Sequence, residues 1–519
     1  MKKLIILFFL SVSFYAFTQE QTLGLFMNDA ESYNGYTIIA PTSSKIVFLI
    51  DNCGQVVHEW ESEYKSGLMT YLSEDGYLLR AGNISNDIFQ TGGAGGIIEK
   101  IDWNSEVIWS YEWASETGYQ HHDIEELPNG NILILAWELH TAEDAISRGR
   151  LPQNTGNNVW ATHIIEIEPT MPTGGNIVWE WRLWDHMVQN TDMYLPEYGQ
   201  INEHPRKVNI NYEATGGTTL SAQDWIHTNS IDYSEGLDQI IISSRIFNEF
   251  WIIDHSHSTE ITKSIPGDLM YRWGNPEAYD RGNVADKKLF KQHDCKWIEN
   301  GLSGEGDILL FSNGNDRPEG NYSTVEQITP IEMVDGTYPI SNNEPFGPTS
   351  ATWIYPQVFD EEFYSQNVSG AQRLPNGNTL ICEGASGEIF EINGDNEIVW
   401  KYVNPLSKFG PLEQGSTPSL TAVFRSLRYS SDYPALINVD LTPHGNMELN
   451  PLTSYCEFYN NIDCYGDFNS DEVITVSDIL LLIVELTCLE DCYTDLDFDG
   501  SSGVSDLLIL LTIFGSNCN

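Results

Sequence analysis

Basic residues are scarce in this chain of 519 residues, where 25 Lys and Arg stand against 75 Asp and Glu. The formal net charge of −50 argues against nucleic acid as a partner, because binding its phosphates requires a basic surface. The acidity predicts a soluble protein and, near the C-terminus, ligands for calcium. A site for an anionic substrate must then be positive locally, against the field of the whole molecule.

Long apolar runs are also missing. Residues 4–10, 479–486 and 507–514 are too short to cross a bilayer, so we expect no membrane span. The first run follows Met1-Lys2-Lys3 and precedes small and polar residues, which is typical of a secretion signal over residues 1–19. We therefore expect a secreted protein, periplasmic or extracellular.

The eight cysteines are unevenly spread. Five lie in the last stretch, at Cys456, Cys464, Cys488, Cys492 and Cys518, and three lie in the body, at Cys53, Cys295 and Cys382. Such clustering in an exported chain predicts disulfides in a small C-terminal module, residues 456–519. Because five is odd, one cysteine is left over or pairs outside the cluster.

Two kinds of segment alternate between about residue 45 and residue 440. The first is an apolar alternation, a polar turn and a strand ending in an aromatic residue, at 46–60, 97–109, 163–181, 250–273 and 388–400, with a weaker copy at 324–355. The second places Asn-Gly or Asp-Gly between apolar strands, as in residues 122–135 and 373–382. Both are hairpin signals.

Paired, the two segments give about four strands per unit in roughly six units, a pattern typical of a β-propeller. We predict an all-β, six-bladed propeller over residues 20–450, followed by a small α-helical module. The sixth unit would join residues 423–428 to the first hairpin, which closes the ring and removes open sheet edges.

Histidine is scarce, with 12 residues, yet three begin similar strand-like segments: His122, His227 and His293. The innermost strands of a propeller line its central channel, so these side chains are expected to converge at one mouth. Asn229 follows His227 by two positions and is expected on the same side. Arg245 ends the next strand of that unit.

This set favours an oxyanion site over a metal site. No H-x-H, H-E-x-x-H or carboxylate at ligand spacing accompanies the histidines. A guanidinium offers a fork of donors that matches the oxygens of sulfate or phosphate, and a neutral imidazole is a competent nucleophile for either centre. The plainer alternative is that each histidine only binds loop backbone, which the recurrence together with Arg245 argues against.

A family resemblance rests on specific strings. Residues 224–233, 242–245, 292–294, 309–315 and 373–380 resemble the bacterial arylsulfate sulfotransferase family. The resemblance implies a six-bladed propeller that moves a sulfuryl group from an aryl sulfate to a phenol, with neither a nucleotide sulfate donor nor a catalytic cofactor.

The same resemblance implies the roles of the site residues. His293 matches the nucleophile that is transiently sulfated, and His227, Asn229 and Arg245 match the set that holds the sulfuryl group. His122 matches a further histidine that acts on the phenolic oxygen. The better-known members carry an additional N-terminal β domain, whereas the repeats here begin soon after the signal. Ser369 is a candidate for a remaining hydroxyl of the family's site.

Near the C-terminus, two twelve-residue segments have oxygen side chains at calcium-loop spacing. They predict the ligands Asp467, Asn469, Asp471, Thr475 and Asp478, and Asp495, Asp497, Asp499 and Asp506. The pair resembles dockerin-type repeats, which have Asp at position 12, although Glu472 stands where glycine usually turns the first loop. The resemblance implies a calcium-binding module and a cohesin-like protein as its candidate partner.

Two other functions fit the same fold, because fold does not decide function. A non-catalytic propeller could bind an anionic or sulfated ligand and use the module for assembly. A phosphodiesterase or metal hydrolase ranks third, and its activity would disappear with a chelator.

Overall fold

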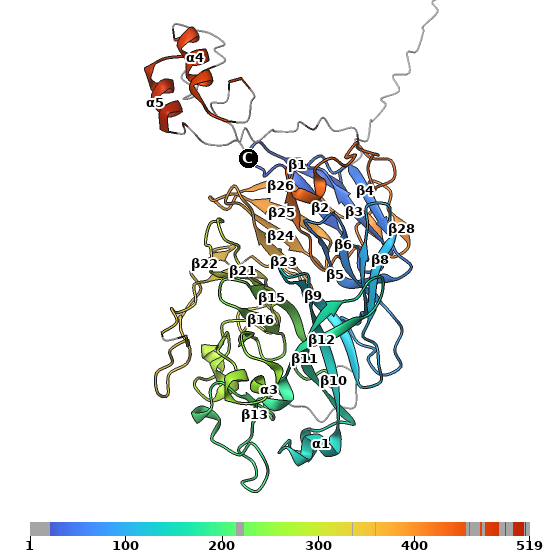
Figure 1. Cartoon of the computed structure of the whole chain (residues 1–519), viewed down its shortest axis with the longest axis vertical. Helices are drawn as coiled ribbons and strands as arrows, with labels where there is room; N and C mark the ends of the chain where they lie inside the picture. The colour runs from blue at the N-terminus through green and yellow to red at the C-terminus, as the bar shows by residue number, and fades with distance from the viewer. Residues whose placement is uncertain are drawn as a thin grey trace, which may run out of the picture.

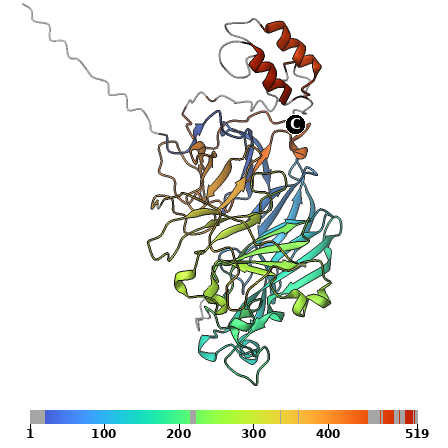
Figure 2. The ribbon, with the colours of Figure 1, turned by 90° about the vertical axis from the view of Figure 1, so that its left-hand side faces the viewer.

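The computed structural model describes residues 21–213, 223–334, 336–358, 360–452, 456, 468–469, 473–486, 494, 502–512 and 514. The predicted signal segment lies outside these residues. Six antiparallel sheets of four or five strands are arranged around a common centre (Figures 1 and 2), which confirms the six-bladed propeller. The sheets run from Gly24 to Ser430.

Each blade is a meander whose first strand lies next to the channel. The first three comprise β5 (Lys65–Leu72), β6 (Leu78–Asn83), β7 (Gly96–Ile101) and β8 (Val107–Glu112); β9 (Gly118–Glu126), β10 (Ile132–Thr141), β11 (Asn158–Pro169) and β12 (Gly175–Arg182); and β15 (Thr228–Ser234), β16 (Gln239–Ser244), β17 (Glu249–Asp254) and β18 (Tyr271–Trp273). The next two comprise β19 (His293–Trp297), β20 (Ile308–Ser312), β21 (Thr324–Ile328) and β22 (Trp353–Tyr355); and β23 (Gly370–Arg373), β24 (Thr379–Glu383), β25 (Glu388–Ile392) and β26 (Ile398–Val403).

The sixth blade joins the two ends of the propeller. Its strand order is β29 (Arg428–Ser430), β2 (Gly35–Ile39), β3 (Ile46–Ile50) and β4 (Val56–Glu61). The closing strand therefore begins at Arg428, the last residue of the predicted segment 423–428, and the rest of that segment leads into it. Two strands of the blades were not predicted: β2, and β1 (Gly24–Asn28), which adds a fifth strand to the preceding blade by pairing with β26.

Tryptophans of the outer strands explain the aromatic end of the repeat. The indole N–H of Trp109 donates to the carbonyl of Gly174 in the next blade (2.9 Å), and Trp181 donates to Gly267 (2.8 Å). Trp273 and Trp400 bond the following blade in the same way, through Pro348 and Asn52. Each such residue buries a large ring between blades and satisfies its single donor there.

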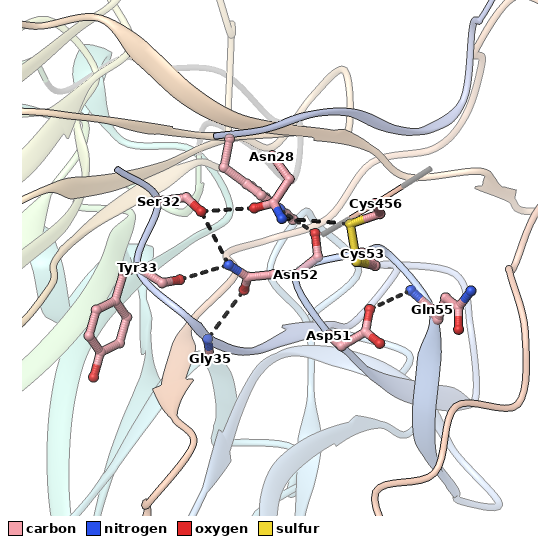
Figure 3. Close-up of a disulfide and its surroundings, with 10 residues drawn as sticks. Asn28, Ser32, Tyr33, Gly35, Asp51, Asn52, Cys53, Gln55 and Cys456 are labelled. Atoms are coloured by element: carbon pink, nitrogen blue, oxygen red, sulfur yellow. Dashed lines mark hydrogen bonds between the residues drawn. A yellow bond between two sulfur atoms is a disulfide. The ribbon is translucent and has the colours of Figure 1, made fainter. Parts of the chain in front are cut away.

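A disulfide joins Cys53 in the β3–β4 turn to Cys456, beyond the last blade (Figure 3). One cysteine of the C-terminal cluster therefore pairs outside it. The turn is held by Asn52, whose amide accepts from the Gly35 N–H (3.2 Å) and donates to the Tyr33 carbonyl (2.9 Å). Cys464, Cys488, Cys492 and Cys518 lie outside the described residues.

Helices are few in the described part of the chain. They are α1 (Ala142–Ser147) and α3 (Thr259–Thr262) between strands, and α4 (Val476–Glu485) and α5 (Val504–Thr512) near the C-terminus. The last two pack on each other around Leu482 and Leu510. Among the described residues, no helix combines the length and apolar character that a bilayer crossing requires.

Bulges interrupt the inner strands where they line the channel. In β9, residues 121–123 oppose Leu135 alone, and β15 and β19 shift register after Thr228 and His293. His122 and His227 adopt positive φ values of 52° and 49° at or beside these bulges. Bulges re-aim side chains and cluster next to functional sites, so this backbone decides where the histidines point.

Candidate active site

The structure brings His122, His227 and His293 together at the channel. The rings of His122 and His227 lie 4.8 Å apart, centroid to centroid. The charge of His227 acts on both other histidines and lowers the pKa of each, although burial is the larger cause. Three adjacent blades thus place three imidazoles around one point, as the repeat predicted.

His293 is held by Asn313, at the end of the adjacent strand β20. The His293 Nδ1 lies 2.6 Å from Asn313 Oδ1, while the Asn313 amide nitrogen donates to the carbonyls of Ser365 (2.7 Å) and Val368 (3.0 Å). Two carbonyl acceptors fix the nitrogen, so the oxygen must face the histidine. Nδ1 therefore carries the proton, and Nε2 of the neutral ring presents its lone pair.

His227 is held by a carboxylate instead. Its Nδ1 lies 2.5 Å from Asp224 Oδ2, and the other oxygen of Asp224 accepts from the Trp137 indole (2.8 Å). The Asp224 side chain is buried, while that of His227 is 18% exposed. His227 is therefore partly exposed to solvent, and of the three histidines it is the one whose ring is bonded to a carboxylate.

His122 is enclosed on all sides. Its Nδ1 lies 2.8 Å from Nδ1 of His121, whose ring stacks on Trp137. Burial, reinforced by His227 and His121, lowers the pKa of His122 well below its usual range, so its ring is neutral at physiological pH. Gly93 covers the ring, and its backbone oxygen accepts from the His122 N–H (2.8 Å).

Two cations make this mouth positive. Arg245 follows β16, and its backbone N–H donates to the His227 carbonyl (3.1 Å). After burial, the charge of Arg245 is the next cause that lowers the pKa of His293. Within the described residues, neither a hydrogen bond nor an ion pair occupies its guanidinium. Burial, and then Arg245, lower the pKa of Lys291, which shows that the two cations lie close together. Positive charge thus gathers here in a strongly acidic protein.

Asn229 and Ser369 are placed differently from the histidines. Asn229 lies within the bulge of β15, so alternation from His227 does not apply; its side chain is fully buried and donates to the Gln292 carbonyl (2.8 Å). That contact orders the residue before His293, and a role on the sulfuryl group stays a prediction. The Ser369 hydroxyl is also fully buried and bonds Ser365 (2.8 Å).

Arg425, just before the closing strand, joins the histidine-bearing strands. It forms ion pairs with Asp123 (2.8 Å) and Asp294 (3.2 Å), the residues that follow His122 and His293. It also donates to the carbonyl of Asn229 (3.1 Å). The side chains of all three ionic groups are nearly or fully buried. One guanidinium therefore sets the spacing of all three histidine strands.

Beyond Arg425, the channel opens into a cavity of about 490 Å³. Its lining includes residues that follow the histidines along the same strands, such as Glu125, Asp232 and Lys296, together with residues of other segments, among them Arg373, Arg425 and Arg428. Burial raises the pKa of Asp232 to about 7 and that of Glu125 well above its usual range. Carboxylates and cations thus line this cavity together.

A stability prediction follows for Asp232. Between about pH 4 and pH 7 the folded protein keeps a proton here that the unfolded chain has released, so stability falls as pH rises through that window. Asp232→Asn retains an acceptor for the Trp297 N–H (2.8 Å) and removes the charge. We expect its melting temperature to exceed that of the wild type by about 1–3 °C at pH 8 and by less at pH 5. Equal differences at both pH values would contradict this.

Three residues of the site were not predicted from the sequence: Asp224, Asn313 and Arg425. Asp224 stands three residues before His227, a spacing that the search for metal ligands passed over. Asn313 and Arg425 belong to other segments of the chain, and only the strand repeats, which place each segment at the channel, could have indicated them.

The predicted calcium ligands are described only in part. Asp467, Asp471, Asp495, Asp497 and Asp499 lie outside the described residues. Asp478 accepts from the N–H groups of Asn469 (3.2 Å) and Thr475 (2.8 Å), and Asp506 accepts from that of Gly503 (2.6 Å). The described residues hold no group of three or more His, Cys, Asp or Glu placed for a metal, and the calcium site stays a prediction.

Fold and site together define a six-bladed propeller with imidazoles and unpaired positive charge at one mouth of its channel. A model of the arylsulfotransferase (ASST) family matches residues 18–404, and the chain belongs to this family. Arylsulfate sulfotransferase AssT of Escherichia coli O6:H1 (strain CFT073) is 21% identical over 380 residues, which cover 66% of this chain and 58% of the relative. The chain thus spans less than two thirds of that relative.

Solved structures show more distant likenesses. A protein of unknown function from Bacteroides caccae is 11% identical, with a TM-score of 0.41, covering 77% of this chain and 100% of its own. Virginiamycin B lyase from Staphylococcus aureus is 12% identical, with a TM-score of 0.32, covering 75% and 90%. Scores this low leave the description of the fold to the strand pairing given above.

Proposed function

We propose that this protein is an aryl sulfate sulfotransferase that moves a sulfuryl group from an aryl sulfate to a phenol through a sulfohistidine. The observation that carries the proposal is the tautomer of His293, whose Nδ1–H is committed to Asn313 and whose Nε2 is free of protein partners in the described structure. Family membership and the relative's name support the same reaction.

Two displacements balance the reaction. The His293 Nε2 lone pair attacks sulfur, the bond from sulfur to the aryl oxygen breaks, and that oxygen keeps the electron pair and gains a proton. The acceptor phenol then loses its proton and attacks sulfur, and the N–S electron pair returns to Nε2. Arg245, with Asn229 and the neighbouring histidines, would hold the sulfuryl oxygens, whose charge must be stabilised in both steps.

The experiment is mass spectrometry of the protein quenched at high pH, where N-sulfonated histidine survives, after brief exposure to 4-nitrophenyl sulfate without acceptor. We expect an adduct of one sulfuryl group, located on His293, and its loss when phenol is added before quenching. Steady-state rates with both substrates should show ping-pong kinetics. An unmodified His293 in an active enzyme would overturn the proposed intermediate.

The non-catalytic alternative makes the opposite prediction. A propeller that only binds sulfated ligands would release no 4-nitrophenol, and it would retain 4-nitrophenyl sulfate after His293→Ala. Equilibrium dialysis of the wild type and this variant separates the two functions.

Gly93 provides a test of the position of His122. A Cβ at Gly93 would lie 1.9 Å from Cε1 of His122, and φ at this glycine is +97°. Gly93→Ala must therefore displace the ring, and we expect a loss of about 10²-fold in transfer rate, since a shift of about 1 Å in a site costs that much. Gly92→Ala meets nothing within 4 Å and is the control. Equal activity of the two variants would contradict this.

We propose in addition that the protein is exported and that its C-terminal segment binds calcium. Disulfides persist in oxidising compartments, which supports export. At the starts of α4 and α5, Asp478 and Asp506 each accept from the backbone N–H three residues earlier. This shared contact supports two equivalent loops. Calcium should raise the thermal stability of the C-terminal segment, and Asp478→Ala should remove that response, without changing transfer. A cohesin-like partner stays a proposal on the resemblance alone.

A further inference from the structure

The rings of the three histidines have different hydrogen-bond partners, and the partner determines how well each ring can hold a second proton. His293 faces a neutral amide, His122 faces another imidazole, and His227 faces the carboxylate of Asp224. A carboxylate stabilises an imidazolium by charge as well as by its hydrogen bond, whereas an amide or a second imidazole does not. His227 is therefore the histidine equipped to carry a proton.

The orientation of Asp224 fixes the free nitrogen of His227. One oxygen of the carboxylate accepts from Trp137 and the other from Nδ1 of His227, so the carboxylate cannot turn away. Nδ1–H is thereby held, and Nε2 points away from Asp224. In the described structure no protein group bonds this nitrogen, which leaves it for a substrate oxygen.

The three histidines also differ in how deeply they are buried, and the difference again sets His227 apart. As whole residues, His122 and His293 are each 3% exposed, and burial lowers the pKa of both well below the usual range. The His227 side chain is 18% exposed. A group that exchanges a proton with leaving and arriving phenols must lie where substrates enter, and of the three histidines His227 alone combines partial exposure with a carboxylate partner.

We infer that His227, supported by Asp224 as its positioning residue, is the acid and base for the phenolic oxygens, in place of His122. This rests on the proposed sulfuryl transfer. In the first step the Nε2–H of His227 passes to the departing oxygen as the S–O electron pair moves onto it. In the second step the acceptor O–H returns a proton to Nε2 as its oxygen bonds sulfur.

Dependence on the leaving group tests this inference. A 4-nitrophenolate departs without a proton, whereas a plain phenolate needs one. We expect Asp224→Asn to keep kcat/KM for 4-nitrophenyl sulfate, which in ping-pong kinetics reports the first step alone, within about 10-fold. It should reduce kcat/KM for phenyl sulfate by about 10²–10³-fold, the usual range for loss of acid catalysis. His227→Gln keeps an N–H donor for a sulfuryl oxygen but cannot carry a proton, so it should show the same selective loss. It provides a second variant should Asp224→Asn fold poorly.

A matched pair elsewhere serves as control. Asp254 and His257 have the same spacing as Asp224 and His227 and a bond of 3.0 Å, but the His257 side chain is 37% exposed and lies outside the channel. Asp254→Asn should leave both rates unchanged.

The outcomes separate the two proposals. No turnover of either donor by the wild type would defeat the proposed function itself. Wild-type turnover with equal losses for both donors in Asp224→Asn and His227→Gln would defeat only the inference, as would a selective loss in His122→Gln instead.

Discussion

An alanine at position 293 is expected to abolish sulfuryl transfer, with a loss of about 10⁴-fold or more, because no group remains to accept the sulfuryl in the first step. Removing a donor that only stabilises charge costs less, about 10²–10³-fold. Arg245→Gln is therefore expected to lose about 10²–10³-fold in rate. Comparing the two losses distinguishes a nucleophile from a residue that only stabilises charge. Initial rates of 4-nitrophenol release measure both.

The loss in His293→Ala must be chemical and not structural. The ring of His293 makes one hydrogen bond, to Asn313, so its removal leaves a small gap at the channel surface and the fold intact. His257→Ala removes a surface histidine and should keep full activity. A His293→Ala protein that melts like the wild type yet retains activity within 10-fold would exclude a sulfohistidine on this residue.

The pH dependence of the transfer rate also tests the assignment of His293 as the nucleophile. Burial and the charge of Arg245 lower the pKa of His293 well below the usual range, so its nucleophilic form persists into mild acid. Asn313→Asp would place a carboxylate on Nδ1 and favour the protonated ring. The acid limb of the rate profile should then move to higher pH. An unmoved limb would show that Asn313 does not control His293.

The channel set was predictable because the repeat fixes position along each blade. A histidine at or near the start of a unit's inner strand lies near the axis, whichever blade carries it, as His122, His227 and His293 do; the bulges then decide where each ring points. What supports them was not predictable. Asn313 acts on His293 only because its amide is turned by carbonyls at 365 and 368, in a segment leading to another blade.

Local backbone set a second limit on prediction. The expectation for Asn229 assumed regular alternation, and the bulge in β15 removes that regularity. Nothing in the residues of that segment marks the bulge, since it arises from closing the inner strands around the channel. The closing strand shows the same limit: apolar periodicity located its region, but pairing with β2, which the repeat does not include, set its start at Arg428.

Replacing Arg425 by methionine is expected to destabilise the protein by about 3–5 kcal/mol, because it leaves the buried Asp123 without a cation and Asp294 with Lys296 alone, 3.4 Å away. Asp123 and Asp294 approach from separate blades, and Arg425 is the only described cation that pairs with both. Arg182 provides a matched control: it also bridges two carboxylates, Glu138 and Glu180, but its side chain is 30% exposed. Solvent screens such a pair, so Arg182→Met should cost about 1 kcal/mol or less.

Neutralising the stranded groups should reverse the loss. Arg425→Met with Asp123→Asn and Asp294→Asn removes all three charges of this cluster, and most of the lost stability should return, as measured by chemical denaturation. Burial already raises the pKa of Asp123, and without Arg425 it rises further, so the folded single variant binds protons that the unfolded chain releases. Its deficit should therefore be smaller at pH 5 than at pH 8. A deficit independent of pH, or a triple variant no more stable than Arg425→Met, would mean that packing and not charge gives Arg425 its importance.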